Sequence, residues 1–213
     1  MFRGQVRLWA AMLCCCVSSA VLAAPEFFGE PASDDVRYAA AWVLAAADNL
    51  GRPFVVVDKL DARVYVFESD GRLIGAAPAL LGLTPGDHSI PDIAQRAPAS
   101  LRPDERTTPA GRFESQPGHN DKGEAIVWID YDASLAIHRL RPAPAAERRP
   151  ERLASGSAEA RRISLGCVVV PVAFYEGVVA PQLGRQRGVV YVLPEDRPVS
   201  AMFGDTRASA RAE

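Results

Sequence analysis

The chain has 213 residues, of which 48% are hydrophobic and 23% are charged. These fractions are close to those of ordinary globular proteins, so they exclude a wholly disordered, collagen-like or solenoid chain, and the length suits one domain with a substantial core. The formal net charge of −2 gives no indication of an electrostatic interaction with nucleic acid.

The first 23 residues have the features of a secretory signal peptide. Arg3 and Arg7 precede an uncharged apolar run over 8–17, and small residues follow over 18–24. We expect cleavage after Ala23 and secretion of the remaining chain. The alternative is an uncleaved membrane anchor, although the apolar run is short for a span of about 20 residues.

Cleavage changes the meaning of the cysteine count. Three of the four cysteines are consecutive at 14–16, inside the signal peptide, and only Cys167 remains in the mature chain. Loss of Arg3 and Arg7 also moves the formal net charge from −2 to −4. A lone thiol in a secreted protein forms no internal disulfide, so Cys167 is paired between molecules, buried and inert, or reactive.

Residues 24–52 are expected to form an N-terminal extension that contains one helix. Ser33 is a typical N-cap residue, and Asp34 and Asp35 suit the first turn of a helix. Val36, Ala40 and Val43 recur at helical spacing, and the sequence at 49–51 predicts the end of the helix.

Short strands are predicted from residue 53 onward. The β-branched runs at 54–58 and 63–67, with the Asp70-Gly71 turn before 73–74, predict a β-meander. Further strands are expected at these positions: from Phe113, and over 124–130, 134–138 and 188–193.

The remaining segments are predicted to be loops and helices around this β domain. The proline-rich segment 83–107 is a long loop of the kind that forms a lid or a wall. The basic, alanine-rich segment 139–162 suggests a surface excursion with a short helix, and 172–182 suggests a second helix. Residues 195–213 are expected to form a mobile polar tail.

Cys167 has one favoured partner among three histidines. His88 and His119 lie in turn sequences, whereas His138 ends the apolar strand that begins at 135. A nucleophilic thiol needs a base or a cation, so we identify Cys167 and His138 as a candidate catalytic pair. Gly166 permits a sharp turn beside the thiol, where backbone N–H groups suit an oxyanion. One cysteine and one interior histidine do not complete a metal site, and no phosphate-binding or dinucleotide motif is present.

Four stretches, in the same order along the chain, resemble the L,D-transpeptidases of the YkuD type. Ser164-Leu165-Gly166-Cys167 after a strand-terminal histidine resembles that family's catalytic motif. The runs 55–58, 64–67 and 70–71 are similar to the family's opening hairpin, and 79–82 is similar to the strand end that follows. Residues 108–113 match the family's Thr-Pro-x-Gly-x-Phe segment, so the resemblance covers roughly 53–193.

The resemblance implies a mainly β sandwich or barrel over 53–194, with a few short peripheral helices besides the N-terminal helix. It also implies a cofactor-free enzyme of the bacterial periplasm or cell envelope that transfers acyl groups between peptidoglycan stem peptides. Cys167 would be the nucleophile and His138 the proton donor and acceptor. The Ser164 region would orient the imidazole through its backbone, and Gly166 and Cys167 would supply oxyanion donors. Acylation of Cys167 by carbapenems is expected.

Two features depart from the family pattern. The 25 residues between His138 and Ser164 are more than the family usually has, so 139–162 must loop out. Val169 stands where the family usually has asparagine or arginine. A catalytically weak envelope protein that binds peptidoglycan is therefore one alternative. A sortase-like transpeptidase, with Arg185 or Arg187 as the third residue, is another.

Overall fold

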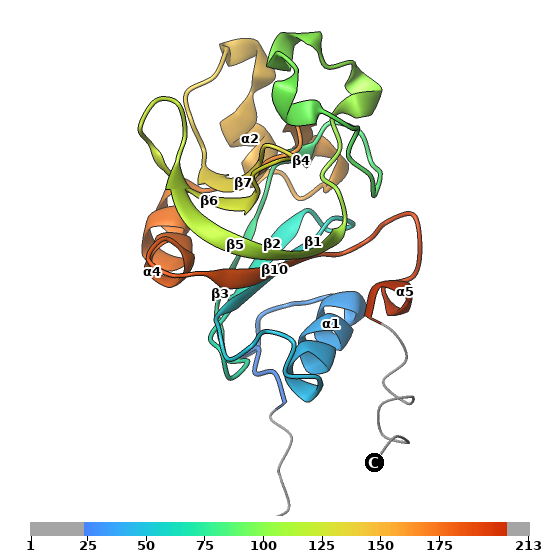
Figure 1. Ribbon diagram of the computed structural model, residues 1–213, viewed down its shortest axis with the longest axis vertical. Helices are drawn as coiled ribbons and strands as arrows, with labels where there is room; N and C mark the ends of the chain where they lie inside the picture. The colour runs from blue at the N-terminus through green and yellow to red at the C-terminus, as the bar shows by residue number, and fades with distance from the viewer. Residues whose placement is uncertain (1–23, 204–213) are drawn as a thin grey trace, which may run out of the picture.

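The computed structural model describes residues 24–203, so the predicted signal peptide lies outside the described residues. Its centre is an eight-stranded sheet with the spatial order β3-β2-β1-β10-β5-β6-β7-β9 (Figure 1). A separate two-stranded sheet pairs β4 with β8. The strands are β1 (Phe54–Asp58), β2 (Arg63–Phe67), β3 (Leu73–Pro78), β4 (Leu81–Gly82), β5 (Gly111–His119), β6 (Ala125–Asp130), β7 (Leu135–Arg139), β8 (Arg162–Ser164), β9 (Val168–Val170) and β10 (Gly188–Val192).

The predicted meander forms one end of the sheet, and the last strand of the chain completes the centre. β1, β2 and β3 are antiparallel neighbours, with Val57 opposite Val64. β10 lies between β1 and β5, parallel to β1 and antiparallel to β5. The other end of the sheet contains a second parallel pair, β7 and β9, which brings 135–139 beside 168–170. That parallel pair carries His138 and adjoins Cys167.

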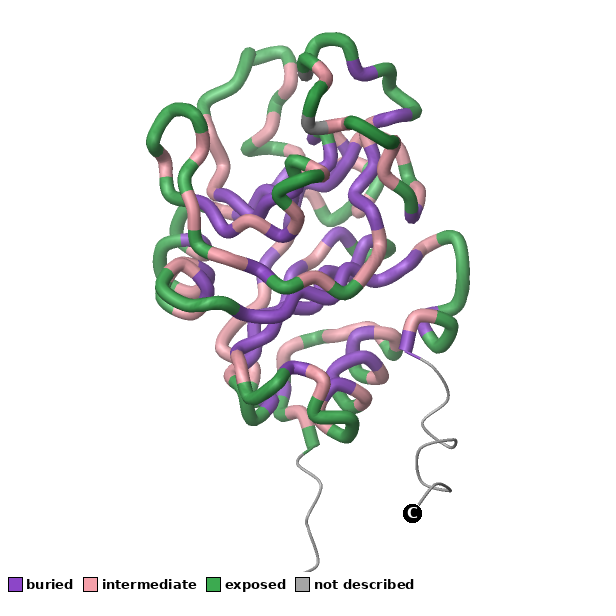
Figure 2. The backbone as a smooth tube through the Cα atoms, in the orientation of Figure 1, coloured by how far each residue is buried: buried purple, intermediate pink, exposed green. Residues whose placement is uncertain are grey.

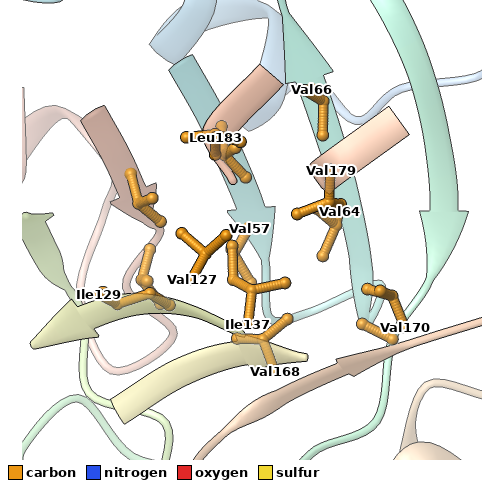
Figure 3. Packing of buried hydrophobic residues seen from close by; sticks show 14 of the residues in the cluster. Val57, Val64, Val66, Val127, Ile129, Ile137, Val168, Val170, Val179 and Leu183 are labelled. Carbon is orange, nitrogen blue, oxygen red and sulfur yellow. The ribbon is translucent and has the colours of Figure 1, made fainter. Parts of the chain in front are cut away.

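The sheet curves so that its two ends share one hydrophobic core. Val57 and Val64, from one end of the sheet, belong to the same buried cluster as Ile137 and Val168 from the other end (Figure 3). Val179 and Leu183, which follow β9 in a helical segment, contribute to this cluster. The structure therefore confirms a mainly β protein with a curved sheet packed on itself and a few short helices. The purple segments in Figure 2 follow these central strands.

A second hydrophobic cluster covers the opposite face of β1 and β10. β1 is buried along its whole length because alternate side chains enter the two clusters, Val55 one and Val56 the other. Helix α1 (Asp34–Ala45) packs its buried residues Val36 and Val43 onto this second face. The Ser33 hydroxyl accepts a hydrogen bond from Val36 N–H, as the predicted N-cap requires, and donates to Asp58.

The C-terminal segment is ordered further than its sequence suggests. The polar composition predicts a mobile tail from residue 195, but helix α5 (Ser200–Phe203) places Phe203 against Trp42 of α1 and Tyr191 of β10. Glu195 is also buried in an ion pair with Lys59. The folded domain therefore extends beyond residue 195, because the Phe203 ring and the Glu195 carboxylate have partners that are distant in the sequence. Residues 204–213 lie outside the described part of the chain.

The segment 139–162 forms an excursion above the sheet beside the loop 83–107 (Figure 1). It contains helix α2 (Arg149–Ala154) and two short 3-10 turns, Ala145–Glu147 and Glu159–Arg161. The whole segment is expected to lie at the surface, but at its C-terminal end Arg161 and Arg162 are buried. The helix expected over 172–182 is present as α3 (Val172–Phe174), a π-helical turn (Tyr175–Val179) and α4 (Ala180–Leu183).

Replacement of Phe203 by alanine tests whether this C-terminal segment belongs to the domain. Phe203→Ala removes a ring packed among aromatic neighbours, so we expect the free energy of unfolding to fall by about 3 kcal/mol. Urea denaturation of the purified protein measures the change. Ala201→Ser, at an exposed position of the same helix, should change it by less than about 0.5 kcal/mol. Equal stability of the two variants would show that Phe203 contributes no packing.

Candidate active site

Cys167 lies in a tight turn between β8 and β9. Gly166 precedes it with a φ of +140°, a conformation that L side chains rarely adopt. A Cβ at Gly166 would also lie 2.7 Å from the carbonyl oxygen of Thr107. Glycine is thus required here by both the backbone conformation and the close approach of a neighbouring loop.

Two buried hydroxyl groups fix this turn. Ser164 Oγ donates to the Cys167 carbonyl at 2.7 Å and accepts from Gly166 N–H at 3.1 Å. Thr108 Oγ1 donates to the Gly166 carbonyl at 2.7 Å and accepts from Gly82 N–H at 2.9 Å. Ser164 therefore shapes the turn, and the predicted oxyanion donor Gly166 N–H already has an acceptor. Thr108 connects the predicted Thr-Pro-x-Gly-x-Phe segment to the cysteine turn.

His138 lies on β7, and Cys167 lies directly before the neighbouring parallel strand β9. Ile137 and Val168 point into the core, as Figure 3 shows, so their neighbours His138 and Val169 face the opposite side. His138 is the register partner of Val169, and Cys167 immediately precedes β9. The predicted pair is thus brought to adjacent parallel strands.

The imidazole is oriented by the residue that follows it. His138 Nδ1 lies 2.8 Å from the carbonyl oxygen of Arg139. Because a carbonyl oxygen only accepts, Nδ1 carries the proton and Nε2 keeps the lone pair that a base needs. The Ser164 region is expected to orient the ring through its backbone. In the structure the carbonyl that contacts the ring is that of Arg139, and the Ser164 carbonyl accepts from Leu83 N–H at 3.0 Å.

Burial keeps both members of the pair neutral. His138 is 8% exposed, and this burial lowers its pKa to about 4, assisted by the positive charges of Arg141 and Arg149. Burial likewise raises the pKa of the Cys167 thiol, although the Ala136 backbone N–H opposes this effect. The thiol donates to the Ser134 carbonyl at 3.4 Å, and neither group is hydrogen-bonded to the other. The directions of these two pKa shifts favour a neutral thiol and a neutral imidazole at pH 7.

The thiol opens into a cavity of about 290 Å³. The loop 83–107 forms one wall, as expected for a segment of this length, and the turn after β6 forms another. The lining residues are Ser89, Ile93, Arg96, Leu101, Thr107, Pro109, Asp121, Ala133, Ser134, Leu135, Leu165, Gly166 and Cys167. Neither Arg185 nor Arg187, the two candidates for the third residue of a sortase-like arrangement, lines this cavity. His119 lines a separate groove near Tyr175.

Lys59, which no sequence motif includes, holds the cavity walls through its buried ammonium group. Lys59 Nζ donates to the Gly86 carbonyl and Asp87 Oδ1, both at 2.7 Å, and to the Thr108 carbonyl at 3.0 Å. Glu195 lies 3.2 Å from the same nitrogen. Burial acts to raise the pKa of Asp87, but hydrogen bonds from Lys59 and two backbone N–H groups hold it below its ordinary value. The sequence feature that distinguishes Lys59 is its rarity, since it is one of only two lysines in an arginine-rich chain.

Within residues 24–203, no three His, Cys, Asp or Glu side chains gather as metal ligands. No helix in this part of the chain has the length and apolar character needed to cross a membrane.

Comparisons with known proteins give matches only among solved structures. No family model matches the sequence, and a search of curated proteins finds no match. The structure is similar to that of the L,D-transpeptidase LdtMt1 in complex with imipenem, with 16% identity and a TM-score of 0.37, over 66% of this chain and 58% of that chain.

Two further similar structures are L,D-transpeptidases. The catalytic domain from E. faecium has 17% identity and a TM-score of 0.36, over 67% of this chain and 98% of that one. The protein from Xylanimonas cellulosilytica has 18% identity and a TM-score of 0.38, over 67% and 60%. The chain thus spans less than two thirds of LdtMt1 and of the Xylanimonas protein. All three belong to the family that the sequence motifs resemble.

The role of Thr108 can be tested by removing its hydroxyl group. Thr108→Val keeps the shape of the side chain but leaves the buried Gly82 N–H and Gly166 carbonyl without their partner. We expect the free energy of unfolding to fall by about 2–4 kcal/mol, as measured by urea denaturation. Thr84→Val removes a single hydrogen bond to the Pro103 carbonyl at an exposed position and should cost less than about 1 kcal/mol. Similar losses in both variants would contradict the bridging role.

The protonation states predict how alkylation of Cys167 depends on pH. A thiol with a raised pKa beside a neutral imidazole contains little thiolate at pH 7, so the iodoacetamide rate should rise through pH 9 without a plateau between pH 5 and 8. His138→Ala should leave this profile above pH 6 nearly unchanged. A plateau near neutral pH that His138→Ala abolishes would instead demonstrate a thiolate–imidazolium pair in the resting protein.

Proposed function

We propose that the protein is a cysteine-dependent L,D-transpeptidase that acts on peptidoglycan stem peptides in the cell envelope. The observation that carries the proposal is the position of the buried His138 on β7 and of Cys167 directly before the adjacent parallel strand β9, with the thiol opening into a cavity. The motif resemblance at 108–113 and 164–167 supplies the substrate class.

In the first step, Cys167 Sγ attacks the carbonyl carbon that follows the L-configured centre of the diamino acid in a stem tetrapeptide. His138 Nε2 takes the thiol proton, and the S–C bond forms as the carbonyl becomes an oxyanion. Collapse of this intermediate breaks the C–N bond, and the imidazolium gives its proton to the departing amine of D-alanine. A thioester on Cys167 and a neutral imidazole remain.

In the second step, an amine on a second stem peptide attacks the thioester. His138 removes a proton from the amine, the C–S bond breaks, and the thiolate recovers the proton. The net reaction exchanges one amide for another, so it requires no oxidant, metal or organic cofactor. Water in place of the amine would give carboxypeptidase activity.

The backbone of the cysteine turn is our candidate for oxyanion stabilisation. The Cys167 N–H is the candidate donor, because Gly166 N–H already donates to Ser164 Oγ. In this proposal, Ser164 and Gly166 support catalysis by fixing the turn.

A catalytically weak protein of the same fold is the second candidate function. A base with a pKa of about 4 gains little by taking a proton from a thiol whose pKa is raised, and the thiol is bonded to Ser134 rather than to His138. Val169 has no polar side-chain group, and it is fully buried beside Leu80 and Leu153. Such a protein would bind peptidoglycan without efficient transfer.

Intact-mass measurement after exposure to a carbapenem distinguishes these candidates. We expect a covalent adduct of one drug molecule, absent in Cys167→Ala and formed at least about 100-fold more slowly in His138→Ala, because general-base catalysis contributes about 10²–10⁴-fold. A tetrapeptide muropeptide should then yield D-alanine and crosslinked dimers.

His119→Ala is the matched control, since that imidazole is exposed and does not line the cavity. It should react like the unmodified protein. A folded protein that forms no adduct and releases no D-alanine would favour the weak-activity alternative.

A further inference from the structure

The cavity beside Cys167 contains two charged side chains, and one of them is already neutralised. Arg96 Nη1 donates to Glu105 Oε1 at 2.9 Å, and its Nη2 donates to the Ser100 carbonyl at 3.2 Å. Hydrogen bonding from Arg96 and the Arg102 backbone also holds the pKa of Glu105 below its ordinary value. Arg96 therefore stabilises the loop through these contacts, and Glu105 compensates its positive charge.

The other charged side chain, Asp121, has no such partner. Within residues 24–203, its carboxylate forms no hydrogen bond or ion pair with the protein, although it lines the cavity. Asp121 sits in the turn between β5 and β6, which Asn120 fixes: Asn120 Oδ1 accepts from Lys122 N–H at 3.0 Å and from Glu124 N–H at 2.9 Å. The carboxylate is thus presented by an ordered turn on a wall of the site.

Part of the remaining lining suits an aliphatic chain, while Ser89, Thr107 and Ser134 contribute polar groups. Apolar side chains come from three separate segments: Ile93 and Leu101 from the loop, Leu135 from β7, and Leu165 from the cysteine turn. A cavity of about 290 Å³ is at the small end of ligand sites and accommodates a side chain with its adjoining backbone rather than a long peptide. These apolar side chains beside one unpaired carboxylate are complementary to a cation carried on methylene groups.

We propose that Asp121 binds a primary ammonium group carried on an aliphatic side chain of the peptide substrate. The inference rests on the proposed acyl transfer at Cys167 and adds a specificity determinant to it. The same ammonium chemistry has two sources in that reaction. One is the side chain of the donor residue whose carbonyl is attacked, and the other is the amine of the acceptor peptide.

Binding without turnover tests the recognition directly. The probe is a stem tetrapeptide with lysine at its third position, titrated by calorimetry into Cys167→Ala, alongside the same peptide with an acetylated lysine side chain. We expect acetylation to weaken binding about fivefold, the size of an exposed ion pair. The difference should shrink at high salt. Asp121→Asn should remove the difference, and Asp121→Glu, which keeps the charge, should retain it.

Asp132→Asn is the matched control. Asp132 is an exposed acidic residue on the neighbouring turn and does not line the cavity, so its loss changes the net charge equally without changing the preference. A preference that survives in Asp121→Asn, or that disappears equally in Asp132→Asn, would overturn the proposal. So would equal binding of the two peptides by the parent variant.

Turnover with Cys167 present identifies the source of the ammonium group. If Asp121 holds the donor, Asp121→Asn slows D-alanine release from the lysine tetrapeptide and leaves carbapenem acylation unchanged. If it holds the acceptor, D-alanine release is unchanged and the product shifts from dimer to hydrolysed peptide. Absence of both binding and acylation would refute the proposed function together with this inference, whereas acylation without charge preference would refute this inference alone.

Discussion

The geometry of the candidate site depends on one buried ammonium group. Lys59 is 0% exposed, and its three strongest contacts come from Gly86, Asp87 and Thr108, at the two ends of the loop that walls the cavity. A buried cation is tolerated only with close partners, and here two carboxylates and two carbonyl groups provide them. Arg162 extends this network by donating to both the Lys59 carbonyl and Glu195. The compact tetrahedral donor set of lysine suits these separate acceptors better than a planar guanidinium would.

A continuous series of hydrogen bonds leads from this ammonium group to the nucleophile. Lys59 fixes the Thr108 backbone, the Thr108 hydroxyl fixes Gly166, and Gly166 determines the direction of Cys167. Each link is buried, so loss of one member leaves a polar group without a partner. This explains why the ordered chain extends to the C-terminal segment: Glu195 is needed to compensate Lys59 and Arg162. The segment is thus part of the structure that supports the site.

The sequence was informative where a local pattern decides the structure. The β-branched runs and the Asp70-Gly71 turn predicted the meander, and Ser33 predicted the start of α1. The lone Cys167 indicated which turn to consider as a candidate site. Features that depend on contacts between distant segments were not visible. The local sequence assigns Glu195 and Phe203 to a polar tail, and only their contacts with Lys59 and Trp42 show that they belong to the domain. The low pKa of His138 likewise arises from tertiary burial, which the strand pattern alone does not quantify.

The two departures from the expected motif pattern meet in one buried cluster. Val169 belongs to a small buried cluster with Leu80, and its third member is Leu153 of α2, inside the long segment 139–162. The excursion therefore packs an apolar side chain over the position where the family usually carries a polar one. An asparagine at 169 would lose this packing and leave an amide among hydrocarbon groups, which costs free energy unless it finds hydrogen bonds. A polar group at this position is therefore disfavoured by the present packing of α2, and we expect it to be accommodated at lower cost if the excursion changes as well.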